Sequence, residues 1–142
     1  MRFMVLVKAN KDSEAGILPS KELFAEMGQF NEQMIKAGVM LAADGLQASS
    51  KGARINYSGE KRVVTDGPFT ETKELIAGFW LIQVKSREEA IEWLKRAPFR
   101  EGQVEIRQVF EASDFPADVI PPEHAAREEA LREQLQRQAA KQ

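Results

Sequence analysis

The stretch over residues 62–84 reads RVVTDGPFTETKELIAGFWLIQV, and it decides how the rest of the chain is interpreted. Its first apolar residues form a strand that ends at Asp66, and a longer apolar run over residues 75–84 forms a second strand. Between them, Gly67 and Pro68 are residue types that make tight turns. Because loops held on a rigid scaffold often carry function, we expect the functional site of an α+β domain beside this turn.

Outward from this stretch, the spacing of apolar residues and the cap signals predict the remaining elements of one domain. The predicted elements are a strand over 3–7, a polar loop over 10–16, a helix from a Ser20 cap to Gly38, a strand over 39–43, a hairpin over 54–64 with its turn at Ser58-Gly59, a helix from a Ser86–Glu89 capping box to Pro98, and a strand over 104–110. Apart from the inserted hairpin, the order is βαββαβ. This order predicts an α+β, ferredoxin-like sandwich with both helices on one face of the sheet.

A second apolar face of the sheet is also predicted, because the helices cover only one face. The expected side chains of the uncovered face are Met4, Leu6, Trp80 and Ile82. Leaving such side chains in water would forfeit roughly 1.5–3 kcal/mol each, a cost that a soluble monomer avoids. We therefore expect a homodimer in which two sheets pack face to face.

The composition changes along the chain, so we expect a domain over residues 1–112 and a polar, helical extension over residues 113–142. Pro122 suits the first turn of a helix. The charged and Ala-rich residues that follow carry only Leu131 and Leu135 as an apolar stripe. One interpretation is a solvated helix, and the other is a tail that packs across the dimer.

Composition bounds the class of protein. The chain has 142 residues, of which 43% are hydrophobic and 30% charged, with a formal net charge of -2 and no cysteine. It lacks a cluster of Lys and Arg that would neutralise phosphates, so we expect no direct contact with nucleic acid. No apolar run approaches the ~20 residues of a membrane span, and the first residues lack a signal-peptide pattern. We therefore expect a cytoplasmic protein without membrane contact.

Candidate chemical groups are few. The one histidine, His124, lies in the extension, so schemes that need His as base or metal ligand lose that group, and we expect no metal and no cofactor. The remaining candidates lie at the turn and the neighbouring strand ends. They are Asp66 as a catalytic residue, and Asp44, Phe69, Glu71, Lys73, Glu74 and Trp80 as binding residues.

Asp66 has two interpretations. In the structural one, its side chain accepts hydrogen bonds from backbone amides of the turn, and Phe69 fills the core. In the functional one, apolar Phe69, Phe79 or Trp80 shields the carboxylate from water, and the carboxylate transfers protons. The residues alone leave both interpretations open.

Several motifs together resemble the DGPF-domain branch of the YCII-related superfamily. These are DGPF at 66–69, TETKE at 70–74, GFWLI at 78–82, AGVMLAADGLQ at 37–47, EEAIEWLKRAP at 88–98 and EIRQVF at 105–110. The resemblance covers residues 1–111. It implies a dimeric α/β barrel of ferredoxin-like protomers with a pocket near the DGPF motif.

The resemblance implies little about activity, because most members of this family have no established function. Some members are encoded near extracytoplasmic-function sigma factors. Some relatives are lyase-like enzymes that use a His-Asp pair in the barrel pocket, whereas this chain has no histidine in the domain.

Three functions are consistent with the sequence. The first is a dimeric small-molecule-binding protein, with isomerase- or lyase-like proton transfer by Asp66 and pocket walls of Phe69 and Trp80. The second is a non-catalytic regulatory or interaction module associated with a sigma factor, with residues 113–142 as its appendage. The third is a structural dimer with a filled cavity.

Overall fold

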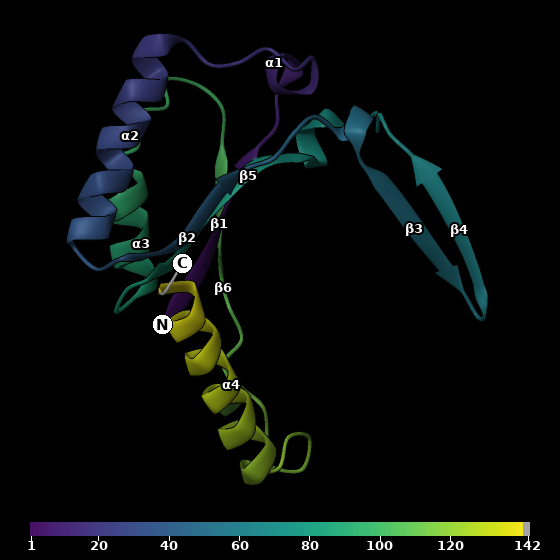
Figure 1. Ribbon diagram of the computed structural model, residues 1–142, viewed down its shortest axis with the longest axis vertical. Coiled ribbons are helices and arrows are strands. Elements are labelled where there is room, and N and C mark those ends of the chain that lie inside the picture. Colours follow the sequence, from purple (N-terminus) through teal and green to yellow (C-terminus); the bar gives the residue numbers. More distant parts are fainter. Residues whose placement is uncertain (141–142) are drawn as a thin grey trace. The chain divides into compact units, whose positions relative to one another are not determined.

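The computed structural model describes residues 1–140. The chain forms two compact units, Met1–Gln108 and Val109–Gln142. Figure 1 shows the elements of both units. The first unit contains β1 (Arg2–Lys8), α1 (Lys11–Glu14), α2 (Lys21–Lys36), β2 (Met40–Gly45), η1 (Ser49–Lys51), β3 (Ala53–Ser58), β4 (Lys61–Asp66), η2 (Thr72–Glu74), β5 (Ile76–Gln83), α3 (Arg87–Leu94) and β6 (Val104–Gln108).

Four strands form an antiparallel sheet in the order β2-β5-β1-β6. The first half of the unit runs from β1 to β2, and its edge strand β2 lies beside β5 of the second half. The second half runs from β5 to β6, and its edge strand β6 lies beside β1, so the two halves interleave. Helices α2 and α3 lie on one face of this sheet (Figure 1). The arrangement is α+β and is compatible with the predicted ferredoxin-like sandwich.

The two long helices of this unit begin and end at local signals in the sequence. The Ser20 side chain accepts from the Leu23 amide at the start of α2, and Gly38 adopts a φ of 71° just after its end. At α3, the Ser86 hydroxyl accepts from the Glu89 amide, whereas the Glu89 carboxylate accepts from the Lys85 amide. Caps of this kind satisfy backbone groups that lack partners inside the helix.

The hydrophobic core lies between the sheet and these helices. Each element contributes apolar side chains at the spacing that its geometry requires. The buried core side chains are Phe3 and Val5 of β1, Phe30 and Met34 of α2, Val39, Trp80, Ile82 and Val84 in and beside β5, and Ala90 and Leu94 of α3.

The register between β1 and β5 corrects the predicted composition of the second sheet face. Trp80 and Ile82 lie opposite Val5 and Phe3 of β1, and they are only 5% and 0% exposed. They therefore belong to the core beneath the helices, and the prediction that they lie on the uncovered face is wrong. Alternation along one strand separates two sets of side chains but does not say which set the helices cover.

The uncovered face carries the other set of residues from the same strands. Met4 pairs with Leu81, and Leu6 pairs with Phe79. All four are half-buried. Along β6, charged residues lie opposite Met4 and Leu6. This face is therefore apolar over β1 and β5 and charged along β6.

Strands β3 and β4 form a separate two-stranded antiparallel sheet, the predicted hairpin. Ser58 pairs with Lys61, so the turn is Gly59-Glu60, one residue later than predicted. Gly59 has a φ of 60°, which glycine adopts without steric cost. Every residue of both strands is exposed, and Figure 1 shows them away from the four-stranded sheet.

The turn over residues 66–69, the DGPF turn, fastens the base of this hairpin to η1. The Gly67 amide donates to the Gly52 carbonyl at 3.0 Å, and the Phe69 amide donates to Ser49 Oγ at 3.1 Å. Ser49 in turn donates its amide and its hydroxyl to the Glu14 carboxylate. This part of the chain therefore connects α1, η1 and the hairpin.

Two local predictions differ from the structure. The segment 10–16, predicted as a polar loop, contains the short helix α1, because Asn10 and Ser13 form a reciprocal capping box. The last strand of the sheet ends at Gln108 rather than at residue 110, since β6 pairs with β1 only as far as Gln108.

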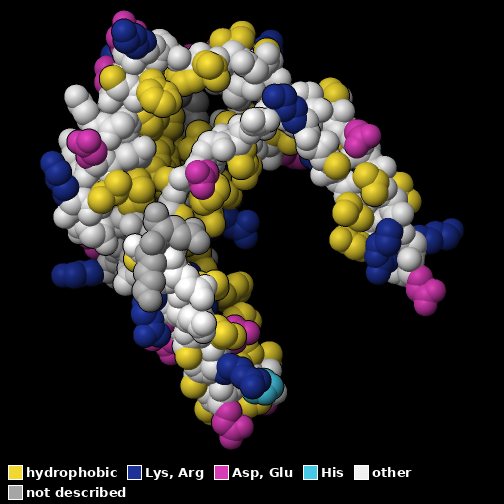
Figure 2. All heavy atoms as spheres, in the orientation of Figure 1, with side chains coloured by type: hydrophobic (Ala, Val, Ile, Leu, Met, Phe, Trp, Pro, Cys, Tyr) yellow, Lys and Arg dark blue, Asp and Glu magenta, His cyan; other side chains and the backbone are white. Residues whose placement is uncertain are grey.

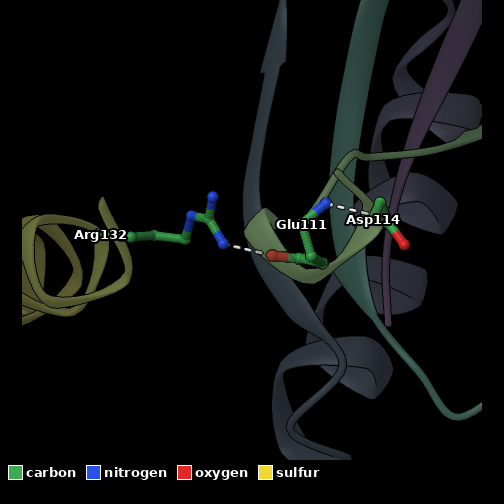
Figure 3. A network of polar contacts seen from close by, with 3 residues as sticks. All are labelled: Glu111, Asp114 and Arg132. Carbon is green, nitrogen blue, oxygen red and sulfur yellow. Dashed lines mark hydrogen bonds and ion pairs between the residues drawn. The ribbon is translucent and has the colours of Figure 1, made fainter. Parts of the chain in front are cut away.

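The second unit contains η3 (Ala112–Asp114) and α4 (Pro122–Ala140). Pro122 is the first residue of α4, as predicted. Arg132 points at the Glu111 carboxylate, and the Glu111 amide donates to the Asp114 carboxylate at 2.7 Å (Figure 3). No described residue of α4 is buried. Over residues 1–140, none of the helices is both long enough and apolar enough to cross a membrane.

Candidate functional site

A cavity of about 900 Å³ lies in the first unit, between α2 and the sheet. Its walls come from the segment between α1 and α2, the first half of α2, the segment after β2, and the start of β5. Ligand sites in proteins typically occupy about 300–1,000 Å³ and combine apolar walls with a few polar groups. The cavity is therefore the candidate functional site.

Trp80 forms the inner wall of the cavity. Its ring makes edge-on contacts with Phe30 and Phe99, at centroid distances of 5.7 and 6.0 Å. Its indole Nε1–H donates to Asn31 Oδ1 at 2.9 Å. Trp80, Phe99 and Asn31 all line the cavity. The inner wall is thus aromatic and holds one carboxamide in a set orientation.

The mouth of the cavity is apolar and open to solvent. Four lining side chains there are exposed by 44–84%: Ile17, Leu18, Phe24 and Leu46. Figure 2 shows hydrophobic side chains gathered around a hollow on α2 and the segment before it. Exposed apolar side chains that meet at a hollow are typical of surfaces that bind a ligand or partner.

Three charged residues lie among the lining residues: Glu14, Asp44 and Lys51. The Glu14 carboxylate accepts two hydrogen bonds from Ser49. Asp44 is exposed at the end of β2. Its pairing with Phe79, next to the pair of Ala43 with Trp80, places its side chain on the face away from Trp80. Lys51 is exposed in η1 and adds a cationic group to the lining.

Two of the seven candidate residues from the sequence line this cavity: Trp80 at the wall, and Asp44 at the rim with its side chain on the other face of the sheet. The other five lie outside the lining: Asp66, Phe69, Glu71, Lys73 and Glu74. Phe69 is half-buried beneath the Arg54 guanidinium, 3.8 Å from the ring centroid.

Asp66 is exposed at the end of β4. Over residues 1–140 its carboxylate has no hydrogen bond or ion pair, so it does not form the predicted hydrogen bonds to turn amides. It also lacks the apolar enclosure that the proton-transfer interpretation requires. The turn acts instead through its backbone, which holds η1.

Sequence reasoning missed Asn31, Glu14 and Ser49. One signal could have revealed Asn31, because it follows Met27 by four residues and so lies on the inward, apolar stripe of α2. No comparable signal marks the contact between Glu14 and Ser49, which are separated by 35 positions in the chain.

Comparison with known proteins gives the family. A sequence model of the YCII-related domain matches residues 1–113. The chain belongs to the YCII-related family. All lining residues of the cavity fall within this YCII-related domain. Over residues 1–140, no three His, Cys, Asp or Glu side chains lie close enough together to hold a metal ion.

One relative of this YCII-related chain is an uncharacterized protein of Rhizobium meliloti (strain 1021). The two are 29% identical over 90 residues, which cover 61% of this chain and 73% of that protein. The name of that relative assigns no activity, so function has to be argued from the cavity.

Proposed function

We propose that this YCII-related protein binds a small, largely apolar molecule in the cavity beside Trp80. The observation that carries the proposal is the cavity itself, of about 900 Å³, with an aromatic inner wall and an apolar mouth. The apolar side chains at the mouth are exposed to water, and a molecule bound against them would remove that apolar surface from water.

Proton transfer by Asp66 is not part of this proposal. Asp66 is exposed and outside the cavity lining, so it cannot reach a molecule held against Trp80. Binding, rather than isomerase- or lyase-like chemistry, is the function that this geometry supports.

A variant that fills the cavity tests the proposal. Ala43 lines the cavity and lies opposite Trp80 on the neighbouring strand. We expect Ala43→Leu to abolish binding of fragments that shift the Trp80 indole N–H resonance in NMR spectra of the wild-type protein. Ala53→Leu, on the exposed strand β3, is the matched control and should bind like the wild type.

Two outcomes would reject the pocket. In the first, no compound of a fragment library shifts the Trp80 indole resonance more than it shifts the Trp93 indole resonance. Trp93 lies outside the cavity lining and serves as the reference. The other is binding that survives Ala43→Leu unchanged in a correctly folded variant.

We also propose that the protein is a homodimer that packs through the uncovered sheet face. Support comes from the half-buried, apolar pairs Met4–Leu81 and Leu6–Phe79 on that face. Burying them against a second copy would contribute roughly 25 cal/mol for each Å² of apolar surface.

Sedimentation should give a dimer for the wild type and a monomer for Leu81→Glu. Val63→Glu, on the exposed hairpin, should remain dimeric. A monomeric wild type would reject the dimer.

A second candidate function is a protein-interaction module, and the compact second unit favours it. Leu131 and Leu135 are 53% and 65% exposed on α4, and they lie one turn apart on one side of the helix. A partner helix, such as one from a sigma factor, would cover this stripe.

A pull-down tests this function: the full chain should retain a purified sigma factor, whereas a chain ended after Ala112 should not. If neither chain retains the sigma factor, or if both chains retain it equally, this function is contradicted.

A further inference from the structure

We infer that Asn31 selects the ligand of this cavity by donating a hydrogen bond, so that the bound molecule carries an oxygen acceptor, a carbonyl or carboxylate, beside an apolar body. The inference rests on the proposed function, because it concerns a molecule bound in the same cavity. It adds the chemical class of that molecule and the residue that recognises it.

The orientation of the Asn31 carboxamide follows from its partner. An indole N–H can only donate, so the oxygen of the carboxamide must face Trp80, and the hydrogen bond of 2.9 Å joins these two atoms. The nitrogen of the same group must then point away from Trp80. Trp80 is only 5% exposed and packs against Phe30 and Phe99, which keeps the indole, and hence Asn31, in place.

The two amide hydrogens of Asn31 have no protein acceptor within residues 1–140. No fully buried side-chain nitrogen in this part of the chain lacks a partner, so the Asn31 nitrogen is accessible to solvent. Asn31 is half-buried and lines the cavity, so water satisfies these donors while the cavity is open. A ligand that displaces this water must supply an acceptor, because an unpaired donor costs about 1–3 kcal/mol. A purely apolar molecule, or one that offers only donors, leaves these hydrogens unpaired.

Asn31 is the polar side chain that is hydrogen-bonded to the aromatic inner wall. The Glu14 carboxylate is engaged by Ser49, and the Asp44 side chain lies on the other face of the sheet. Trp80, Phe99 and Ala43 provide apolar contacts around Asn31. The other polar lining residues come from α1, η1 and the segment between β2 and η1, and they are Ser13, Gln47, Ser50 and the exposed Lys51. The site therefore resembles a hydrophobic slot with one fixed hydrogen-bond donor, which favours discrimination by that donor.

Three probes of similar size test the inference, each with a phenyl ring and a methyl group on the benzylic carbon. Acetophenone carries a carbonyl oxygen, α-methylstyrene replaces that oxygen by a methylene group, and 1-phenylethylammonium replaces it by a cationic donor. The dissociation constant of each is measured by NMR titration of the Trp80 indole resonance, with the Trp93 resonance as an internal reference. Because the three compounds differ in hydration, the measured quantity is the change in their affinity ratios when Asn31 is altered.

Two substitutions change the donor while keeping the surroundings. Asn31→Asp retains an oxygen for the Trp80 indole but presents an acceptor to the cavity. Asn31→Ala removes both contacts. In either variant we expect the affinity of acetophenone to fall about three- to tenfold relative to that of α-methylstyrene. A change of this size corresponds to the loss of one hydrogen bond. In Asn31→Asp alone, 1-phenylethylammonium should gain about tenfold relative to α-methylstyrene.

Trp80→Phe offers an independent test that leaves Asn31 in place. Without the indole donor, the carboxamide is free to rotate and can present either its oxygen or its nitrogen. The advantage of acetophenone over 1-phenylethylammonium should therefore fall in this variant. Its titration follows the ligand resonances, because the indole signal is absent.

The outcomes separate this inference from the proposal beneath it. If all three probes bind the wild type but their affinity ratios do not change in any variant, the donor role of Asn31 is rejected and the pocket stands. If no probe shifts the Trp80 resonance of the wild type, both the pocket and the donor role are rejected.

Discussion

At the scale of single residues, Gly67 explains what the DGPF turn does in this chain. A Cβ atom at this position would lie 1.8 Å from the Ser49 carbonyl oxygen, so only glycine permits the close approach. The amide of Phe69, two residues later, donates to Ser49 Oγ. The turn thus holds η1, two residues of which, Ser50 and Lys51, line the cavity. Its contribution to the site is positional.

Gly67→Ala should therefore destabilise the protein. We expect the free energy of unfolding to fall by about 1–3 kcal/mol, because the methyl group forces the turn away from Ser49. Urea denaturation at one fixed protein concentration measures the change.

Gly28→Ala is the control. Gly28 lies within α2, and a Cβ atom added there would have no atom within 4 Å, so this substitution should stabilise the protein by about 0.5–1 kcal/mol. Equal stability of Gly67→Ala and the wild type would contradict the close approach.

At the scale of elements, the hairpin β3–β4 stands apart from the core. None of its residues is buried, and the base is closed by the pair Ala53–Asp66 and by the hydrogen bond from the Gly67 amide to the Gly52 carbonyl. Two strands alone are marginally stable in water. The DGPF turn and η1 supply the support that the strands lack.

Replacing residues 54–65 by Asn-Gly should leave the domain folded. Ala53 pairs directly with Asp66, and Asn-Gly favours the tight turn that joins two paired strands. We expect the melting temperature to change by less than about 5 °C, since the hairpin contributes no core side chain. Calorimetry and the Trp80 indole resonance provide the measurement. Loss of the native Trp80 signal would show that the hairpin contributes to the core.

At the scale of the whole molecule, the chain divides after Gln108. Within residues 1–140, every buried core side chain lies between Phe3 and Leu94, in the first unit. The second unit has its own internal contacts, including the one between Arg132 and Glu111. The first unit therefore contains both the hydrophobic core and all the residues that line the cavity.

A chain ended after Ala112 should fold and keep the cavity. We expect its melting temperature to lie within about 5 °C of that of the full chain, and its affinity for fragments bound beside Trp80 to be unchanged. Thermal melting and NMR titration of both chains give the comparison. A truncated chain that fails to fold would show that the second unit supplies part of the core.

The sequence by itself determined the type and order of the longer elements, because the signals for these are local, whereas the short helix α1 was missed. Ser20 and Ser86 cap their helices, Gly38 follows the end of α2, and alternating apolar residues mark the strands, each within a few positions of the feature that it specifies. The family assignment likewise came from contiguous motifs. The DGPF turn was correctly placed at the end of a strand, although its side chains do not form the pocket.

Only the tertiary structure decided where the candidate site lies. The register between β1 and β5 places Trp80 beneath the helices, and the contact from Trp80 to Asn31 joins residues 49 positions apart. No local pattern specifies such a contact, because the free energy that selects it comes from packing whole elements together. The cavity is likewise a property of how α2 lies on the sheet, and no single stretch of sequence contains it.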